Sequence, residues 1–589
     1  MKTLLFDALS RQLKGNRQLT QLDSTLMGES WPVQVAGLQG SFLTYYLARI
    51  VKNRSQSMII VVPSEREVDD LVRDLGTLGV NAMGFPWYGT MPYHPVPENS
   101  SVHGTRMRIL AHLCRSQNHR TSKNAPFVCV TSMRAAVSPV PPPEWISDHL
   151  HTIQRGQEFD PTRIARLLSD YGYSRVSRVS IRGEFALRGE VLDIYPPGSE
   201  YAVRVVFAFD TIEDIRGFDP ATQTSIESLA RFSIYPVKEV IWEDGRIDAL
   251  SARLRSLLEF PGDGVQLIEH LYETRTIERE EVFFPLSFPS LTSILDYADS
   301  RTLVVLSEYE RLHSAAEGIG KEFESLHRKT RTEGNFPLPE NLLIPFSDIE
   351  ARVDRVLRCI LLTGKYSPDI RISYDGPRSF FGNIEFLHEE IHNLQQSGYR
   401  ILVGAETTSQ AERISHLLQE SDVQVIPETL QGGFTLPEAK LAVLQENEIF
   451  GRRKRTPASV QKTPSQAIET FVELEPGDLV VHVNYGIGLF RGIQRMRASG
   501  NERDYIHLEY AGEEFIYIPI EQVNLIQRYI GQQGSVPRLD KIGGKSWESR
   551  KNKVRKSVED LAERLVELYS KRKQARGYAF PPDTDWQIE

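Results

Sequence analysis

The chain contains 589 residues, of which 40% are hydrophobic and 25% are charged, with a formal net charge of -9. This length exceeds what one hydrophobic core supports, so we expect about four or five domains. The mildly acidic balance excludes a protein that is basic throughout. Any contact with nucleic acid must therefore be local or indirect.

Cysteine usage and hydropathy indicate the compartment. Cys114, Cys129 and Cys359 lie too far apart in the sequence for a CxxC metal site or a disulfide framework, so we expect buried thiols in a reducing environment. No stretch approaches 18 apolar residues, and the apolar run at the N-terminus is too short for a signal peptide. We expect a soluble cytoplasmic protein with neither a metal site nor membrane contact.

Residues 1–143 alternate strand-like apolar runs with helical patterns. The run MIIVVPS is followed by EREVDDLVRDLGTLG, and PFVCVTS comes later. This alternation is typical of an α/β domain with a parallel sheet. The proline-rich stretch VSPVPPPE ends the pattern.

The stretch GLQGSFLT, Gly37 to Thr44, lies where such a domain would carry a phosphate loop. In the motif G-x-x-x-x-G-K-[ST], the second glycine lets backbone N–H groups surround the phosphates and the lysine neutralises their charge. Gly37 and Gly40 are present here, but Phe42 replaces the second glycine and Leu43 replaces the lysine. Thr44, which would hold Mg²⁺, is retained.

The acidic strand end that would complete such a site is also altered. The candidate is LVVLSEYE, where Ser307 occupies the aspartate position and Glu308 follows it. A serine hydroxyl does not replace a carboxylate as a ligand for a hard cation. Two independent losses predict a degenerate nucleotide site without catalytic residues. The alternative is that these segments never belonged to a nucleotide-binding fold.

The pattern changes four times in the middle of the chain. Residues 144–235 carry short β-rich runs separated by Gly, Pro and Asp, which predicts an inserted α+β domain. Residues 236–335 return to strand followed by helix, and we expect them to complete the first α/β domain. A second small α/β domain of unknown role is expected at 336–451, followed by a flexible linker at 452–471.

The last part combines a β-rich region with a helix. Residues 472–545 contain about five short strands with glycine turns, which predicts a small, strongly bent β barrel of SH3/Tudor-like form. Residues 546–589 place apolar side chains at steps of three and four, which predicts a long amphipathic helix. The apolar stripe consists of Val554, Val558, Leu561, Leu565 and Leu568.

Together these pieces resemble the N-terminal half of the bacterial transcription-repair coupling factor family. The matching segments, in the family's order, include GLQGSFLT, RGEFALRGEVLDIYPPGSEYAVRVVFAFDTIEDIRGFD, LVVLSEYE and the block from GDLVVHVNYGIG to KIGGKSW. The first part is similar to the B subunit of nucleotide excision repair. The resemblance implies a multidomain α/β and α+β chain, in which a degenerate P-loop-type domain receives an inserted β-rich domain.

The resemblance also implies partners. In that family the inserted domain binds the excision-repair ATPase UvrA, and the small barrel binds the β subunit of RNA polymerase. The motor, which uses ATP and Mg²⁺ and contacts DNA, follows the barrel. This chain stops at DWQIE, where the family would enter the motor. We therefore expect that the motor is missing and that this chain uses no cofactor.

For the UvrA-facing surface, the resemblance assigns Arg175, Arg188 and Tyr195 by motif position. Arginine offers a planar fork of five donors, and aromatic side chains are common anchors at interfaces. The alternatives are that Arg188 pairs with a local carboxylate and that Tyr195 is a core residue. Relatives often carry an acidic residue where this chain has Val206, so a charge pair at that interface is expected to be missing.

For the polymerase-facing barrel, the preferred contact is the hairpin GIQRMRASGNERDYIHL. Met496 would be its apolar anchor between Arg495 and Arg497, and the alternative is a solvated methionine beside a turn. In EEFIYIPI, alternation places Tyr517 on the face opposite the isoleucines, which suit the core better. Tyr517 is therefore a further contact. An exposed edge strand would pair with a strand of the partner.

The leading hypothesis is a non-catalytic adaptor in transcription-coupled DNA repair, which binds stalled RNA polymerase at one end and recruits UvrA at the other. One alternative is a polymerase-binding transcription regulator that is indifferent to UvrA. The other is an active ATP-dependent DNA translocase, which DNA-stimulated ATP hydrolysis by the purified chain would reveal.

Overall fold

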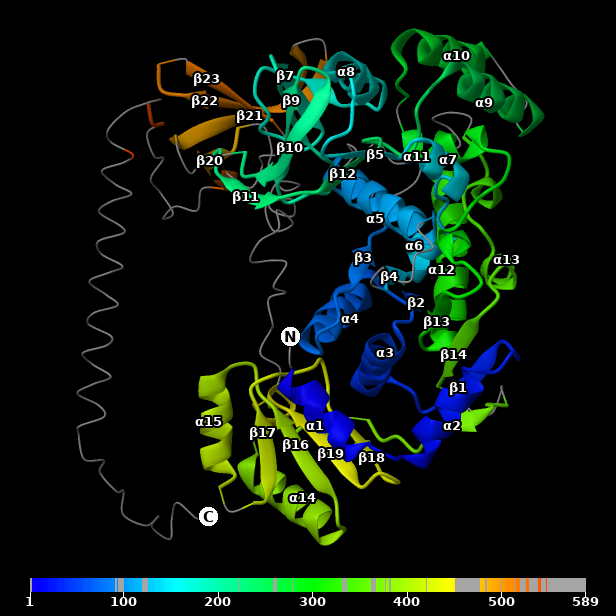
Figure 1. Ribbon diagram of the computed structural model, residues 1–589, viewed down its shortest axis with the longest axis vertical. Helices are drawn as coiled ribbons and strands as arrows, with labels where there is room; N and C mark the ends of the chain where they lie inside the picture. The colour runs from blue at the N-terminus through cyan, green and yellow to red at the C-terminus, as the bar shows by residue number, and fades with distance from the viewer. Residues whose placement is uncertain are drawn as a thin grey trace. The chain divides into compact units, whose positions relative to one another are not determined.

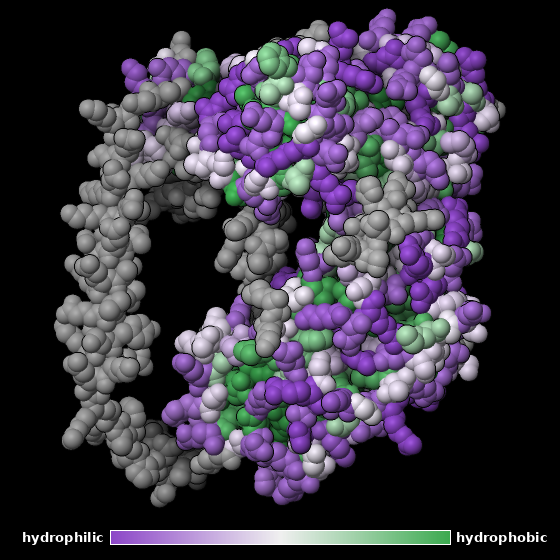
Figure 2. Space-filling model, viewed as in Figure 1, coloured by the Kyte–Doolittle hydropathy of each residue, from purple (hydrophilic) through white to green (hydrophobic). Residues whose placement is uncertain are grey.

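The computed structural model divides into two compact units, Met1–Arg455 and Thr456–Glu589. The residues that the structure describes are 3–89, 93, 100–118, 126–220, 222–257, 262–277, 279–330, 336–361, 367–376, 378–380, 383–419, 421–450, 477–482, 485–498, 501–512, 514–519, 526–528, 539–541 and 547. Hydrophilic residues predominate on the face drawn in Figure 2, and hydrophobic residues form scattered patches between them. No helix in the described part of the chain is long and apolar enough to cross a membrane.

A seven-stranded sheet in the order β15-β1-β14-β13-β2-β4-β3 organises the first unit. All of its strand pairs are parallel, which confirms the predicted parallel α/β sheet. The strands are β1 (Val33–Ala36), β2 (Met58–Val62), β3 (Met83–Phe85), β4 (Val128–Ser132), β13 (Leu303–Leu306), β14 (Val356–Ile360) and β15 (Ile370–Arg371).

Helices pack beside this sheet, and further helices follow the insertion in the sequence (Figure 1). The helices before the insertion are α1 (Leu4–Gln12), α2 (Arg17–Thr25), α3 (Gly40–Arg54), α4 (Glu65–Thr77), α5 (Ser100–Asn118), α6 (Met133–Val137) and α7 (Pro143–Asp148). Those after it are α9 (Asp244–Leu257), α10 (Gly262–Thr274), α11 (Glu280–Phe283), η1 (Phe284–Ser287), η2 (Ile294–Tyr297), α12 (Tyr309–Thr330), η3 (Pro339–Asn341) and α13 (Phe346–Ala351).

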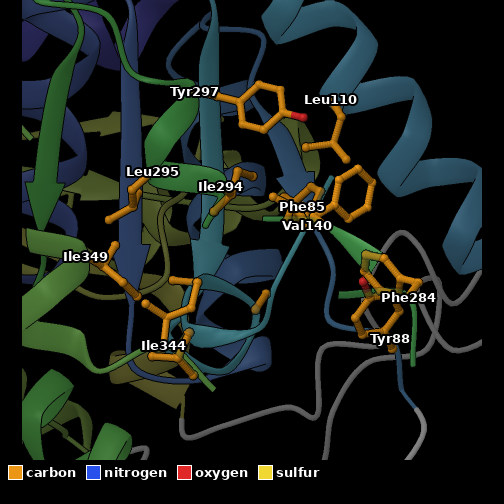
Figure 3. Packing of buried hydrophobic residues seen from close by; sticks show 14 of the residues in the cluster. Phe85, Tyr88, Leu110, Val140, Phe284, Ile294, Leu295, Tyr297, Ile344 and Ile349 are labelled. Atoms are coloured by element: carbon orange, nitrogen blue, oxygen red, sulfur yellow. The ribbon is translucent and has the colours of Figure 1, made fainter. Parts of the chain in front are cut away.

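The sheet is buried on both faces, which explains its continuous apolar strands. In β2, Ile59 and Val61 join one buried cluster, whereas Met58, Ile60 and Val62 join the other. Figure 3 shows part of the first cluster, in which aromatic and aliphatic side chains from distant segments pack together.

A buried ion pair between Arg106 and Glu239 connects the segment that follows the insertion to this core. Arg106 in α5 is fully buried, and its Nε donates to Glu239 Oε1 at 2.5 Å. The Tyr88 hydroxyl donates to the other carboxylate oxygen at 2.8 Å. The Arg106 guanidinium also lies over the Tyr88 ring at 3.7 Å from its centre. A buried charge is tolerated here because it is paired and hydrogen-bonded.

The inserted part of the chain forms a second, mainly antiparallel sheet in the order β11-β10-β9-β8-β7-β6. Helix α8 packs on one face of this sheet, as its side chains share a buried cluster with those of the strands (Figure 1). The strands β5 and β12 form a separate pair. The elements are β5 (His151–Gln154), α8 (Pro161–Asp170), β6 (Ser174–Arg175), β7 (Glu184–Arg188), β8 (Val191–Tyr195), β9 (Ala202–Ala208), β10 (Thr211–Phe218), β11 (Ser225–Ser228) and β12 (Arg231–Ile234).

A four-stranded sheet in the order β17-β16-β19-β18 completes the first unit. Its elements are α14 (Ile384–Gln396), β16 (Arg400–Gly404), α15 (Thr408–Leu417), β17 (Val423–Ile426), β18 (Phe434–Leu436), β19 (Leu441–Gln445) and α16 (Glu446–Phe450). The sequence placed all of 336–451 in this second α/β domain, but β14 and β15 belong to the first sheet. They pair in parallel with the distant β1, and local pattern carries no information on such pairing.

The second unit contains a five-stranded antiparallel sheet in the order β23-β22-β21-β20-β24. Its strands are β20 (Leu479–His482), β21 (Gly486–Ala498), β22 (Asn501–Tyr510), β23 (Glu514–Pro519) and β24 (Ile526–Arg528). Its buried core consists of Val480, Phe490, Ile506, Leu508, Tyr510, Ile518 and Ile526. The predicted linker at 452–471 and nearly all of the predicted helix at 546–589 lie outside the described residues.

Candidate functional site

The phosphate-loop position lies in the turn from β1 to α3. Gly37 and Gly40 both have positive φ, at +84° and +51°, which glycine adopts readily. A Cβ atom on Gly37 would lie only 1.9 Å from the carbonyl oxygen of Ile372. The chain that leaves β15 therefore packs directly on this turn.

The two side chains that depart from the motif are buried. Phe42 is fully buried, and its ring packs on Phe434 with centroids 5.5 Å apart. Leu43 is 3% exposed, in the same buried cluster. The Thr44 hydroxyl donates to the Gly40 carbonyl at 3.3 Å, so it is engaged within the helix. These residues do not fit a nucleotide, because GLQGSFLT carries no charged side chain and the residues in the glycine and lysine positions are buried.

A segment between β17 and β18 covers the start of α3. The Ser41 hydroxyl accepts a hydrogen bond from the Gly432 N–H at 3.2 Å. Asp74 in α4 accepts another from the Gln431 N–H at 2.8 Å. Ser41 lies in the first turn of α3, and Asp74 lies near the end of α4. Residues 431 and 432 thus pack against α3 and α4 beside the phosphate-loop position.

Ser307 and Glu308 follow β13, at the same edge of the parallel sheet as the β1 turn, with β14 between the two strands. Ser307 is buried, and its N–H donates to the Val61 carbonyl at 3.0 Å. Glu308 pairs with Arg311, which also pairs with Glu67 at 2.9 Å. The remaining carboxylate is thus committed to an arginine. Among the described residues, no group of three or more His, Cys, Asp or Glu side chains is arranged to hold a metal ion.

A charged cluster lies on the face of the insertion sheet opposite α8. Asp193 in β8 is only 1% exposed and accepts hydrogen bonds from two arginines. The Arg188 Nη2 atom is 2.7 Å from Oδ2, and the Arg204 Nε atom is 2.6 Å from Oδ1. These hydrogen bonds raise the pKa of Arg204 above its usual range. We call Arg188, Asp193 and Arg204 the arginine clamp.

The arginine clamp leaves donors facing solvent. The Arg188 side chain is 49% exposed, whereas that of Arg204 is 23% exposed. Each guanidinium has five N–H donors, and Asp193 engages only some of them. The alternative of a local carboxylate partner for Arg188 is therefore observed, and much of the side chain is exposed as well. The sequence analysis did not identify Arg204 as a site residue. The signal for it was the alternation of side chains: Asp193 lies in D-x-Y of β8 and Arg204 lies in R-x-V of β9, so each pattern keeps a polar residue on one face.

The other two residues assigned to this surface differ in accessibility. Tyr195 is 8% exposed and packs with Val179, Ala186 and Phe218, which matches the alternative of a core residue. Its hydroxyl donates to the Glu200 carbonyl at 3.4 Å. Arg175 is exposed in β6, at the edge of the sheet. Arg204 of the arginine clamp lies over the ring of Phe218, which belongs to the same buried cluster as Tyr195.

In the second unit, the structure describes some of the candidate contacts. Arg495, Met496 and Arg497 lie in β21, opposite β22; their side chains lie outside what the structure describes. Tyr517 is 40% exposed and stacks on His507, with ring centroids 4.8 Å apart. Ile518 is buried, so alternation assigned the two faces of β23 correctly.

Two known domain families match the chain. The UvrB interaction domain matches residues 151–240, which contain the arginine clamp. The CarD-like/TRCF RID domain matches residues 474–530, which contain the five-stranded sheet. The fold and these matches define a multidomain protein with one segment similar to a UvrB interaction domain and another similar to a CarD-like/TRCF RID domain.

Similar proteins cover almost the whole chain. The transcription-repair-coupling factor of Borreliella burgdorferi is 29% identical over 99% of the chain, and that of Bacillus subtilis is 30% identical over 94%. The Staphylococcus aureus protein of that name is 27% identical over 93%. The resemblance predicted from the motifs is confirmed, and the two domain matches agree with the N-terminal half of such a protein. The chain spans about half the length of these relatives.

Proposed function

We propose that this chain is the adaptor part of a transcription-repair coupling factor. The insertion binds UvrA, the second unit binds the β subunit of RNA polymerase, and the chain thereby links stalled transcription to nucleotide excision repair. The observation that carries the proposal is the arginine clamp, which holds two guanidinium groups on an exposed sheet face inside the segment that matches the UvrB interaction domain.

The arginine clamp suits recognition of an acidic protein surface. Asp193 fixes the orientation of Arg188 and Arg204, so little side-chain entropy is lost when a partner binds. Guanidinium groups pair with carboxylates through two parallel hydrogen bonds, which adds geometric specificity to the charge. We infer that acidic side chains of UvrA meet the solvent-facing donors of these arginines.

For the polymerase contact we propose the outer surface of the second unit. We propose that this unit is a small, strongly bent barrel of SH3/Tudor-like form. In the described five-stranded sheet, β23 is one of the two edge strands. An edge strand offers unpaired backbone groups to a strand of a partner. Tyr517 and the β21–β22 hairpin with Arg495, Met496 and Arg497 would add side-chain contacts.

We also propose that the phosphate-loop position does not hydrolyse ATP and that this chain uses no cofactor. Phe42 and Leu43 are buried against the segment that covers α3, and Ser307 supplies no carboxylate. ATP, Mg²⁺ and the main contacts with DNA belong, in this proposal, to the motor of the transcription-repair coupling factors. The place of action is the cytoplasm, where stalled polymerase is found.

Binding of the purified chain to UvrA and to the polymerase β subunit, measured separately, tests the proposal. We expect both to bind, and Arg188→Ala to weaken UvrA binding about tenfold while polymerase binding stays unchanged. Arg352→Ala is a matched control, because Arg352 is 40% exposed and also pairs with a carboxylate. Polymerase binding without UvrA binding would instead support the transcription regulator. DNA-stimulated ATP hydrolysis would support the translocase.

A further inference from the structure

One exposed aromatic residue lies at the tip of the insertion sheet. Phe209 is 87% exposed, and its φ of +57° is in the left-handed region. Ala208 in β9 pairs with Thr211 in β10, so Phe209 and Asp210 form the two-residue turn between these strands. The turn therefore presents a phenylalanine ring almost entirely to solvent.

Folding does not account for a phenylalanine at this position. The left-handed region is unfavourable for bulky side chains, and turns of this kind normally use Gly, Asn or Asp. Exposure of the ring also gives no hydrophobic stabilisation within the chain. Backbone strain that brings no internal contact is typical of interaction sites.

The tip lies at the same end of the sheet as the arginine clamp. Arg188 pairs with Val191, and Val191 pairs with Val206, so these three side chains share one face. Both valines are partly exposed, and Ala208 follows on the same face two residues further along β9. An apolar strip thus runs from the exposed arginine to the aromatic tip.

We propose that Phe209 is the apolar anchor of the UvrA-binding surface. Its ring enters an apolar pocket of UvrA, Val191 and Val206 cover the pocket's rim, and Arg188 pairs with an acidic side chain beside it. This inference rests on the proposed function, because continuity with the arginine clamp selects the partner. It also gives Val206 a role, because this side chain shares the face of Arg188 and adds apolar contact beside the charged group.

The geometry offers a substitution that separates folding from binding. Phe209→Gly removes the ring and relieves the positive φ, so its thermal unfolding temperature should equal or exceed that of the wild-type chain. Its dissociation constant for UvrA should rise about tenfold or more, as for the loss of a central aromatic anchor. Phe209→Trp should bind within a few-fold of wild type, because it retains an aromatic ring.

The experiment measures UvrA affinity of the full chain by surface plasmon resonance. Lys440→Gly is the matched control, since Lys440 is an exposed turn residue with a φ of +47° in another part of the chain, and it should bind like wild type. UvrA binding that is weakened by Arg188→Ala but unchanged by Phe209→Gly overturns this inference alone. No UvrA binding by wild type overturns the proposed function as well.

A second copy of the chain is the competing occupant of the tip. Size-exclusion chromatography with light scattering distinguishes it. We expect wild type and Phe209→Gly to elute at the same mass. A wild-type dimer that Phe209→Gly converts to a monomer, with UvrA affinity unchanged, would assign the tip to self-association and overturn the inference.

Discussion

The phosphate-loop position and the arginine clamp are both candidate binding sites, but their polar groups differ in whether they bond within the chain or remain exposed to solvent. At the phosphate-loop position, Ser41 at the start of α3 and Asp74 near the end of α4 accept hydrogen bonds from residues 432 and 431. At the arginine clamp, a buried carboxylate holds two arginines but leaves much of Arg188 exposed. The comparison teaches that a sequence motif marks a working binding site only when packing leaves the polar groups of the motif accessible.

Two phenylalanines should show the largest difference between these regions. Phe42→Ala should lower the free energy of unfolding by about 3–5 kcal/mol, because it leaves a cavity beside Phe434. Phe209→Ala should change it by no more than about 0.5 kcal/mol, since the ring is exposed. Chemical denaturation followed by circular dichroism measures both. Equal losses in the free energy of unfolding would show that Phe42 does not pack in a buried core.

Two glycines give a second matched pair. Gly37→Ala should destabilise the chain by about 2–4 kcal/mol, because its Cβ would collide with the Ile372 carbonyl and its φ is positive. Gly189→Ala, in the turn beside Arg188, should cost only about 1 kcal/mol, since no atom lies within 4 Å of that Cβ. Thermal unfolding of the two variants measures the difference. A mild Gly37→Ala would contradict the close approach of the two backbones.

Removing the charge of Asp193 should loosen the arginine clamp. Asp193→Asn keeps the shape but weakens the hydrogen bonds from Arg188 and Arg204, which should cost about 2 kcal/mol of stability. UvrA binding should weaken about tenfold, because the guanidinium groups lose their fixed orientation. Calorimetric titration with UvrA measures this. If Asp193→Asn were less stable but bound UvrA with unchanged affinity, the arginine clamp would stabilise the fold without contributing to UvrA binding.

The stability of the segment that packs beside the phosphate-loop position should also depend on pH. Glu448 accepts hydrogen bonds from the Gly433 and Gln445 N–H groups, and burial raises its pKa to about 7. The folded state therefore binds this proton more tightly than the unfolded state, so its contribution to stability is present at pH 4 and is lost as the pH rises through 7. Wild type should lose about 1–2 kcal/mol relative to Glu448→Gln between pH 5 and pH 8.

Unfolding midpoints of the two chains at several pH values measure that loss. Glu438→Gln, which changes an exposed carboxylate of the same sheet region, serves as control and should follow wild type. A constant difference between wild type and Glu448→Gln across this range would refute the assignment.

Local pattern predicted the parallel strands, the altered loop and the two faces of β23, because each depends on neighbouring residues. It did not predict that β14 and β15 complete the first sheet, since Val33 pairs with Leu357 across more than half of the chain. Nor did it predict the Phe42–Phe434 contact or the Asp193–Arg204 pair. These depend on tertiary packing. Phe209 was invisible as a site because only its backbone conformation and exposure set it apart.

The most direct test of the adaptor proposal is a bridging assay. The N-terminal region of the polymerase β subunit is immobilised, the chain is loaded, and UvrA is added, with Arg188→Ala as the comparison variant. We predict that UvrA is retained only when the chain is present and that Arg188→Ala releases it while the chain itself stays bound. Retention of the chain without UvrA would contradict the two-ended adaptor.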